Sequence, residues 1–168
     1  ERIIATVDEL ALYARDYPGP DQNAPVILCL PGLTRNSKDF ASLANSLQAT
    51  HRVVCPDQRG RGRSARDTDA TRYRPDRYVQ DMRMLLDLLG IPVVTVIGTS
   101  LGGLMAMILL AVDAAKVRAV VLNDVGPEVD PRGLARIASY VGKSAPVNDW
   151  QAASEQTAHV NGIAFPDY

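Results

Sequence analysis

A single serine is enclosed by glycines in the segment GTSLG, residues 98–102. The segment follows a run of β-branched residues and precedes a long apolar stretch that is typical of a buried helix. A sharp turn from strand to helix strains the backbone, and glycines two residues before and after the serine remove side chains that would collide there. The hydroxyl of Ser100 would then stand at a helix N-terminus, where N–H groups favour negative charge. This pattern predicts that Ser100 is a nucleophile. The alternative is a glycine-rich turn whose serine only caps the helix.

A serine that attacks a carbonyl carbon needs two N–H donors for the oxyanion that forms. The residue after the nucleophile, Leu101, is expected to supply one of them. An earlier apolar run, VILCL, ends at Pro31 and Gly32, and Leu33 follows this turn. We therefore predict that the main-chain N–H groups of Leu33 and Leu101 form an oxyanion hole for acyl transfer. An ordinary turn at the end of a strand is the alternative for Gly32.

A nucleophilic serine also requires a base, and the chain contains two histidines. His51 begins an apolar run, so it is expected at the edge of the sheet opposite Ser100. His159 lies in the C-terminal region, where a solvent-exposed or packing role is expected. Asp124 directly follows the run VRAVVLN and is a candidate for the acid of a catalytic triad. Its alternative role is to organise the junction with the segment that follows.

The chain alternates between strand and helix patterns. Strands are predicted from the runs LALYAR, APVILCL, HRVVCP, VVTVIG and VRAVVLN, and helices from residues 39–48, 76–90 and 100–112, with Asp76 as the N-cap of the second helix. Continuous Val/Ile/Leu runs are typical of parallel strands that are buried on both faces. We therefore predict an α/β fold, with a mostly parallel sheet and helices on both faces. After Pro127 the strand runs cease, which predicts a core in residues 1–126 and the start of a helical cap in residues 127–168.

Four segments in this order resemble the N-terminal part of an α/β-hydrolase: LPG, PDQRGRGRS, GTSLGG and LNDVGPE. The resemblance covers essentially the whole chain, although Pro31 stands where the family usually has histidine. It implies an incomplete α/β-hydrolase fold and a serine hydrolase that forms an acyl-enzyme on Ser100. In that family the histidine follows the last strand, and most members place the acid after a strand that this chain lacks.

A complementary C-terminal segment or a second chain is therefore expected to carry the catalytic histidine. The run VRAVVLND, left as an exposed apolar edge strand, would otherwise favour aggregation. The expected substrate is a small ester, a lactone or an activated carbonyl compound. Alternatives are a hydrolase of carbon–carbon bonds in ring-cleavage diketones, and a non-catalytic small-molecule-binding protein on the same fold. No metal or organic cofactor is implied.

The composition of the chain also bears on which classes of binding partner are expected. The net charge of −1 and the pI of about 6.1 do not favour nucleic acid or an anionic membrane as a partner. The arginine-rich segment at residues 57–77 also contains aspartates, so we expect internal ion pairs there. No run of 18 apolar residues and no signal peptide are apparent. Cys29 and Cys55 are predicted to be buried free thiols on neighbouring strands, and a cytoplasmic location is expected.

Overall fold

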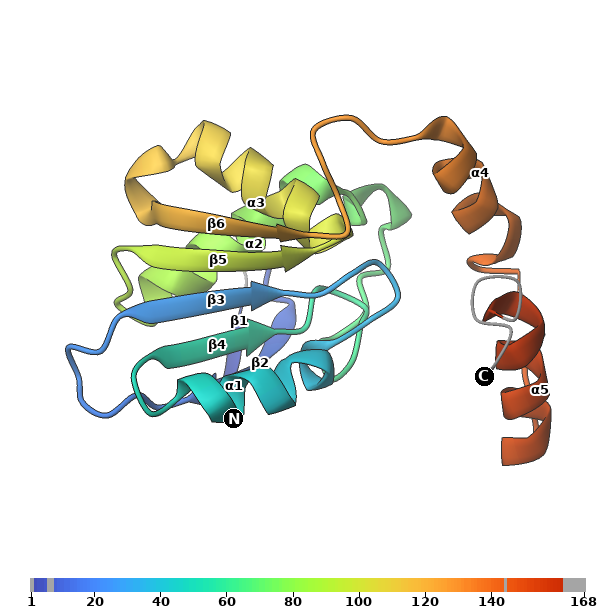
Figure 1. The fold of residues 1–168 in the computed structure, drawn as a ribbon, viewed down its shortest axis with the longest axis horizontal. Coiled ribbons are helices and arrows are strands. Elements are labelled where there is room, and N and C mark those ends of the chain that lie inside the picture. Colours follow the sequence, from blue (N-terminus) through green and yellow to red (C-terminus); the bar gives the residue numbers. More distant parts are fainter. Residues whose placement is uncertain (1, 6–7, 144, 162–168) are drawn as a thin grey trace. The chain divides into compact units, whose positions relative to one another are not determined.

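The computed structural model describes residues 2–5, 8–143 and 145–161, and it divides the chain into two compact units, Glu1–Pro127 and Glu128–Tyr168 (Figure 1). The first unit contains a six-stranded sheet with the order β1-β2-β4-β3-β5-β6. The strands are β1 (Arg2–Ala5), β2 (Ala11–Tyr17), β3 (Val26–Leu30), β4 (Arg52–Pro56), β5 (Val94–Thr99) and β6 (Val117–Asn123). Strands β4, β3, β5 and β6 are parallel to one another, whereas β1 and β2 join in antiparallel fashion. The predicted mostly parallel sheet is confirmed.

Helices cover both faces of this sheet, as predicted (Figure 1). They are α1 (Ala41–Leu47), α2 (Pro75–Leu88) and α3 (Leu101–Val112), with short 3-10 turns at η1 (Ser37–Phe40), η2 (Ala70–Arg72) and η3 (Ala114–Lys116). On one face, Met82 of α2 and Met105 of α3 are buried against Val54 of β4. On the other face, Phe40 of η1 packs with Val53 of β4. Adjacent residues of β4 thus point to opposite faces and are buried on both, as in a parallel sheet that is covered on each side.

The start of α2 differs from the prediction. Asp76 is not the N-cap, because the helix begins one residue earlier, at Pro75, and Arg74 holds the N-cap position. Proline suits the first helical position, since its φ is already near the helical value and no intrahelical acceptor exists for an N–H there. Asp76 instead lies in the first turn of α2 and pairs with Arg74 at 3.0 Å.

The two cysteines are free and buried, as predicted. Cys29 lies in β3 and Cys55 in the neighbouring β4. A hydrogen bond with Cys29 and burial raise the pKa of Cys55 far above its usual value. The thiol of Cys55 is therefore neutral, and both cysteines belong to the core between the sheet and α1.

The second unit consists, in its described residues, of α4 (Pro131–Tyr140) and α5 (Trp150–Asn161). Asp130 caps α4 by accepting a hydrogen bond from the N–H of Arg132 at 2.8 Å. The role of this second unit as a cap over the sheet remains a prediction. Within the described part of the chain, no helix combines the length and the apolar character that crossing a membrane requires.

Strand β6 is the last strand at one edge of the sheet. Val121 is 50% exposed and Leu122 is 39% exposed, although both belong to an apolar run. An edge strand offers unpaired N–H and C=O groups, and apolar side chains beside them make it a template for pairing with another strand. The exposed apolar edge predicted for this segment is confirmed.

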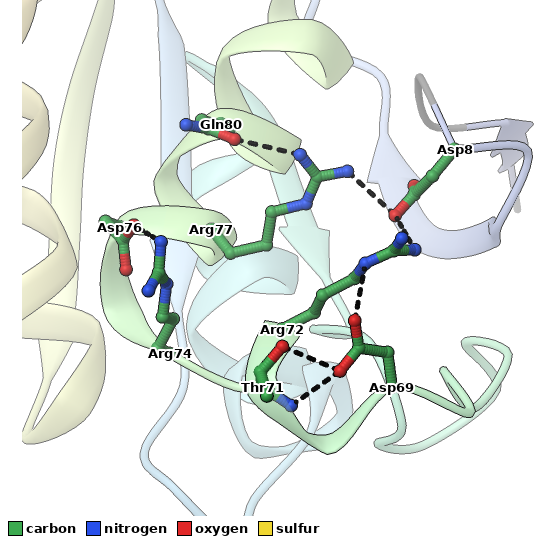
Figure 2. Close-up of a pocket in the computed structure, with 8 residues that line it drawn as sticks. All are labelled: Asp8, Asp69, Thr71, Arg72, Arg74, Asp76, Arg77 and Gln80. Atoms are coloured by element: carbon green, nitrogen blue, oxygen red, sulfur yellow. Dashed lines mark hydrogen bonds and ion pairs between the residues drawn. The ribbon is translucent and has the colours of Figure 1, made fainter.

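The arginine-rich segment forms internal ion pairs, as predicted. Figure 2 shows its outer part, where the guanidinium groups of Arg72 and Arg77 converge on the carboxylate of Asp8 at 3.2 and 2.8 Å. Arg72 also contacts Asp69 at 3.3 Å. Asp8 lies between β1 and β2, whereas Arg77 belongs to α2. These pairs therefore tie the N-terminal hairpin to a helix on one face of the sheet.

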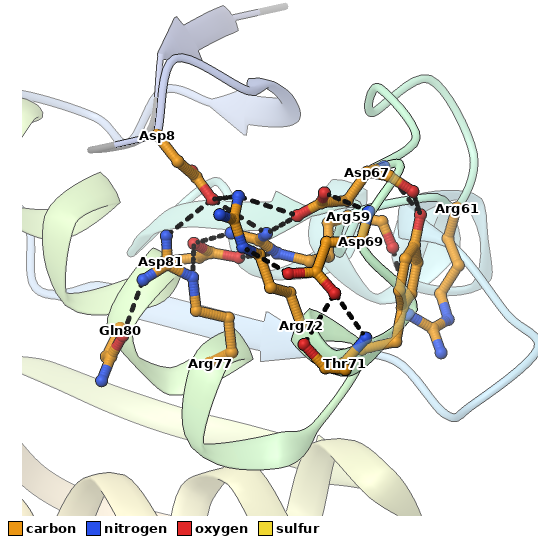
Figure 3. Close-up of polar contacts among 11 residues, drawn as sticks. Asp8, Arg59, Arg61, Asp67, Asp69, Thr71, Arg72, Arg77, Gln80 and Asp81 are labelled. Atoms are coloured by element: carbon orange, nitrogen blue, oxygen red, sulfur yellow. Dashed lines mark hydrogen bonds and ion pairs between the residues drawn. The ribbon is translucent and has the colours of Figure 1, made fainter.

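The centre of this network is Arg59, whose side chain is completely buried (Figure 3). It makes a bidentate contact with Asp81 of α2, at 2.9 and 2.7 Å, and further contacts with Asp8 and Asp67. Burial alone would lower the pKa of Arg59, but its bonds to Asp81 and Asp8 outweigh burial and raise that pKa. The guanidinium group therefore stays charged in the interior.

We predict that Arg59→Met lowers the free energy of unfolding by about 3–5 kcal/mol, because removing one partner leaves buried carboxylates without their counter-charge. Urea unfolding of the variant and of the parent protein measures the difference. Arg74→Gln is the matched control, since the Arg74–Asp76 pair is more than half exposed and its loss should cost less than about 1 kcal/mol. Equal losses for the two variants would contradict the structural role given to Arg59.

Candidate active site

Ser100 is the single residue between β5 and α3, and its backbone is strained. Its φ is 51° and its ψ is −114°, in a region that residues other than glycine rarely occupy. Such a conformation costs about 1–3 kcal/mol and persists only where the surrounding structure enforces it. The N–H of Ser100 bonds to the carbonyl of Asn123 in β6 at 2.9 Å, and its own carbonyl accepts from the N–H groups of Gly103 and Leu104. The sheet on one side and the helix on the other thus fix this residue.

The two glycines around Ser100 leave room for this turn. A Cβ atom on Gly98 would come within 3.0 Å of the backbone of Gly102 and Gly103. A Cβ atom on Gly102 would come equally close to the main-chain carbonyl of Leu30, in β3. Both positions therefore require glycine, for the steric reason that the sequence suggests.

The turn after β3 lies beside the serine. A Cβ atom on Gly32 would be 3.7 Å from the Cβ of Ser100, so these two segments are in van der Waals range. Neither the N–H of Leu33 nor that of Leu101 makes a hydrogen bond with any residue that the structure describes. For Leu101 the reason is its place in the first turn of α3, where an N–H has no intrahelical acceptor. The structure therefore brings together the three residues that the sequence analysis selected, with both N–H groups unused.

Two hydrogen bonds hold the peptide groups around Leu33. The carbonyl of Gly32 accepts from the N–H of Arg35 at 3.2 Å. Because a peptide group is planar, this bond also limits the direction of the Leu33 N–H on the opposite side of the same peptide. The carbonyl of Leu33 accepts a hydrogen bond from Nε of Arg61. The turn is therefore braced on both sides of Leu33.

Arg61 is a contributor that the sequence analysis did not identify. It comes from the loop after β4, and its guanidinium group lies 5.0 Å from the ring centre of Tyr78 in α2. It also donates to the carbonyl of Arg59 at 3.2 Å. Arg61 thus connects the turn at Leu33 to the buried arginine network. No local sequence signal distinguishes it from the other arginines of its segment, because its partner Leu33 is 28 residues away.

The other candidate residues are distributed as the strand order requires. Asp124 directly follows β6, whose last residue Asn123 pairs with Thr99, so Asp124 lies at the same edge of the sheet as Ser100. His51 directly precedes β4 and therefore lies at the opposite edge, as predicted. His159 belongs to α5 of the second unit and is exposed. The structure brings no histidine to Ser100 among the residues of the first unit that it describes.

Arg35 follows the same turn, and the sequence leaves open whether it binds a substrate carboxylate or is a solvated loop residue. In the structure it forms a bidentate pair with Asp39, with distances of 2.6 and 3.0 Å. This bond raises the pKa of Arg35, so the side chain is charged but already has a partner. The solvated, locally paired role is the one observed.

Known proteins share this arrangement. A family model described as the alpha/beta hydrolase fold matches residues 25–159. The crystal structure of an alpha/beta hydrolase from Novosphingobium aromaticivorans is 46% identical, with a TM-score of 0.92, over 99% of this chain and 58% of that one. A 3-hydroxybutyrate-oligomer hydrolase from Cupriavidus necator is 44% identical over 124 residues, which are 74% of this chain and 42% of that protein.

A serine hydrolase-like protein from Danio rerio is 36% identical over 106 residues, which are 63% of this chain and 32% of that protein. The chain therefore spans less than half the length of these two curated relatives. Its matched region contains the strained serine, the two glycines beside it and the turn after β3. On the family match and on its fold, the chain belongs to the α/β-hydrolase family.

Proposed function

We propose that this protein is a serine hydrolase that forms an acyl-enzyme on Ser100. The observation that carries the proposal is the position of Ser100, which is held at a positive φ beside two main-chain N–H groups that have no acceptor among the described residues. A strained residue of this kind indicates function, because its cost must be balanced by the rest of the fold. The unused donors of Leu33 and Leu101 suit an oxygen that gains negative charge during the reaction.

The proposed reaction has two steps. A base removes the proton of the Ser100 hydroxyl as its oxygen attacks the carbonyl carbon of the substrate, and the N–H groups of Leu33 and Leu101 hold the resulting oxyanion. Collapse of this intermediate expels the leaving group, which takes the proton back from the base and leaves the acyl group on Ser100. Water, deprotonated by the same base, then attacks the acyl carbon. The bond from this carbon to Oγ of Ser100 breaks, the base returns the proton to Oγ, and the carboxylic acid product leaves.

We propose that a complementary segment, either C-terminal to residue 168 or on a second chain, supplies the base. Three observations support this. His51 lies at the amino ends of the parallel strands, whereas Ser100 follows the carboxyl end of β5. The outermost strand β6 exposes apolar side chains, and the matched region spans 42% of the Cupriavidus relative. Asp124 is a candidate for the acid, because it lies at the same edge of the sheet as Ser100.

For the substrate, the Cupriavidus relative suggests a starting point. An oligomer of a hydroxy acid is joined by ester bonds, and the proposed mechanism cleaves an ester. We therefore propose a short oligoester of 3-hydroxybutyrate as the first substrate to test, beside p-nitrophenyl esters, lactones and vinylogous keto acids. Preferential turnover of the keto acids would instead support a carbon–carbon bond hydrolase.

We predict that Ser100→Ala abolishes both ester hydrolysis and covalent labelling by a fluorophosphonate probe in the full protein, because the attacking oxygen is removed. Mass spectrometry of the labelled parent protein should locate the probe on the peptide that contains Ser100. Ser42→Ala, an exposed position on α1, is the matched control and should keep full activity. Undiminished hydrolysis by Ser100→Ala would refute the assignment of the nucleophile. A parent protein that binds esters but never labels would support a non-catalytic binding protein.

A second prediction concerns Arg61 as a positioning residue. Arg61→Met removes the hydrogen bond to the carbonyl of Leu33 but keeps most of the apolar stem of the side chain. Direct loss of an oxyanion donor costs about 100- to 1000-fold in rate, so loosening the turn should lower kcat by about tenfold and leave KM nearly unchanged. Steady-state kinetics measure this split. Arg66→Met, an exposed arginine in the same segment, should have no effect, and an unchanged kcat in Arg61→Met would rule out the positioning role.

A further inference from the structure

The side chain of Gln58 is buried although its amide is only partly hydrogen-bonded. Gln58 lies in the loop after β4 and is 1% exposed. Its oxygen Oε1 has no hydrogen-bond partner among the residues that the structure describes. A buried acceptor without a partner costs free energy, and an apolar side chain of similar size would avoid that cost. Glutamine at this position therefore indicates a role other than packing.

The amide nitrogen is the part of this side chain that makes contacts. Nε2 donates to the main-chain carbonyl of Pro31 at 3.4 Å and lies 3.5 Å from Sδ of Met105. Exchanging the nitrogen and the oxygen would set Oε1 against two acceptors, a carbonyl oxygen and a thioether sulfur. The nitrogen therefore faces Pro31, and the atom without a partner is the oxygen.

These two contacts lead to the two segments that carry the proposed oxyanion donors. Pro31 directly follows β3 and stands two residues before Leu33. Met105 is buried in α3, about one helical turn after Leu101. Gln58 therefore contacts both of the segments whose N–H groups form the proposed oxyanion hole.

The loop after β4 also holds the loop after β3 at two further points. The carboxylate of Asp57 accepts a hydrogen bond from the N–H of Ser37 at 2.7 Å, and Nε of Arg61 donates to the carbonyl of Leu33. These two bonds join one loop to the other. Gln58 adds the contact with α3, so it relates the position of the turn to the position of the helix.

We propose that Gln58 is a positioning residue that sets the separation between the N–H groups of Leu33 and Leu101. Oxyanion donors act over a narrow range, about 2.7–3.1 Å from the oxygen that they stabilise. A small displacement of the turn relative to α3 therefore weakens the stabilisation of the transition state. Gln58 is too buried to touch the substrate itself. This role rests on the proposed function, because it concerns the same reaction at Ser100.

Steady-state kinetics of Gln58→Met in the full protein test this role. Methionine fills a similar space but cannot donate to the carbonyl of Pro31. For a p-nitrophenyl ester, kcat should fall about three- to tenfold and KM should stay nearly unchanged, because the displaced donors act mainly on the transition state. Titration with the fluorophosphonate probe counts the reactive sites, so kcat per site is not affected by a loss of folded protein. Gln80→Met, at an exposed position on α2, is the matched control and should keep the kcat of the parent protein.

Gln58→Glu separates positioning from packing, because glutamate has nearly the same shape as glutamine. A protonated carboxyl group can donate to the carbonyl of Pro31 as the amide does, whereas a carboxylate cannot. Burial raises the pKa of a carboxyl group, and the two polar contacts at this position carry no charge. The ratio of kcat in Gln58→Glu to kcat in the parent should therefore be highest at low pH and fall as the pH rises through that pKa.

Three results would overturn the proposal: a kcat per reactive site in Gln58→Met equal to that of the parent, an equal loss in Gln80→Met, or a ratio for Gln58→Glu that does not fall as the pH rises. Gln58→Met decides the question by itself if Gln58→Glu does not fold. Any of these results beside a parent that labels on Ser100 and hydrolyses esters would leave the proposed function intact. A parent that does neither would overturn the proposed function together with the role of Gln58.

Discussion

The close approach of α3 to β3 is the constraint on which the region around Ser100 depends. Because Gly102 has no side chain, the helix backbone reaches the carbonyl of Leu30, and the chain must turn from β5 into α3 within one residue. Ser100 takes up that turn at a positive φ. Burial of Met105 and Leu109 on the same helix, against the sheet, offsets the cost of about 1–3 kcal/mol. The packing that stabilises the fold is thus also the packing that fixes the backbone of Ser100.

The arginine-rich segment is the second constraint, because its side chains contact residues on two sides of the loop. Arg59 points into the interior to Asp81, whereas Arg61 reaches across to the carbonyl of Leu33. Gly60, at a φ of 73°, lets the loop turn between these two residues, and Gly62, at a φ of 54°, lets it turn again after Arg61. The segment is therefore occupied by internal contacts, as its interspersed aspartates predict. It links α2 and the N-terminal hairpin to the turn beside Ser100.

Local sequence patterns predicted much of this architecture, because strand runs and the glycines around Ser100 depend on residues that are close together in the sequence. The β-branched runs located β3 to β6, and the spacing of Gly98 and Gly102 indicated the strained serine between them. Features that depend on contacts distant in the sequence were not predictable in the same way. The hydrogen bond from Arg61 to Leu33 spans 28 residues. The start of α2 depended on whether Pro75 begins the helix or Asp76 caps it. Strand β1, which pairs with β2, was not among the predicted strands.

The strand order also determines which of the candidate residues lie at the same end of the sheet as Ser100. In a parallel sheet the residues that follow the strands meet at one edge, and Leu33, Ser100 and Asp124 follow β3, β5 and β6. His51 precedes β4, so the topology places it at the opposite end of the strands from Ser100 and excludes it as the base. A strand added parallel to β6 would bring the residue at its own carboxyl end to that same edge. A strand paired with β6 would thus cover the exposed apolar edge and add a residue to the end of the sheet where Ser100 lies.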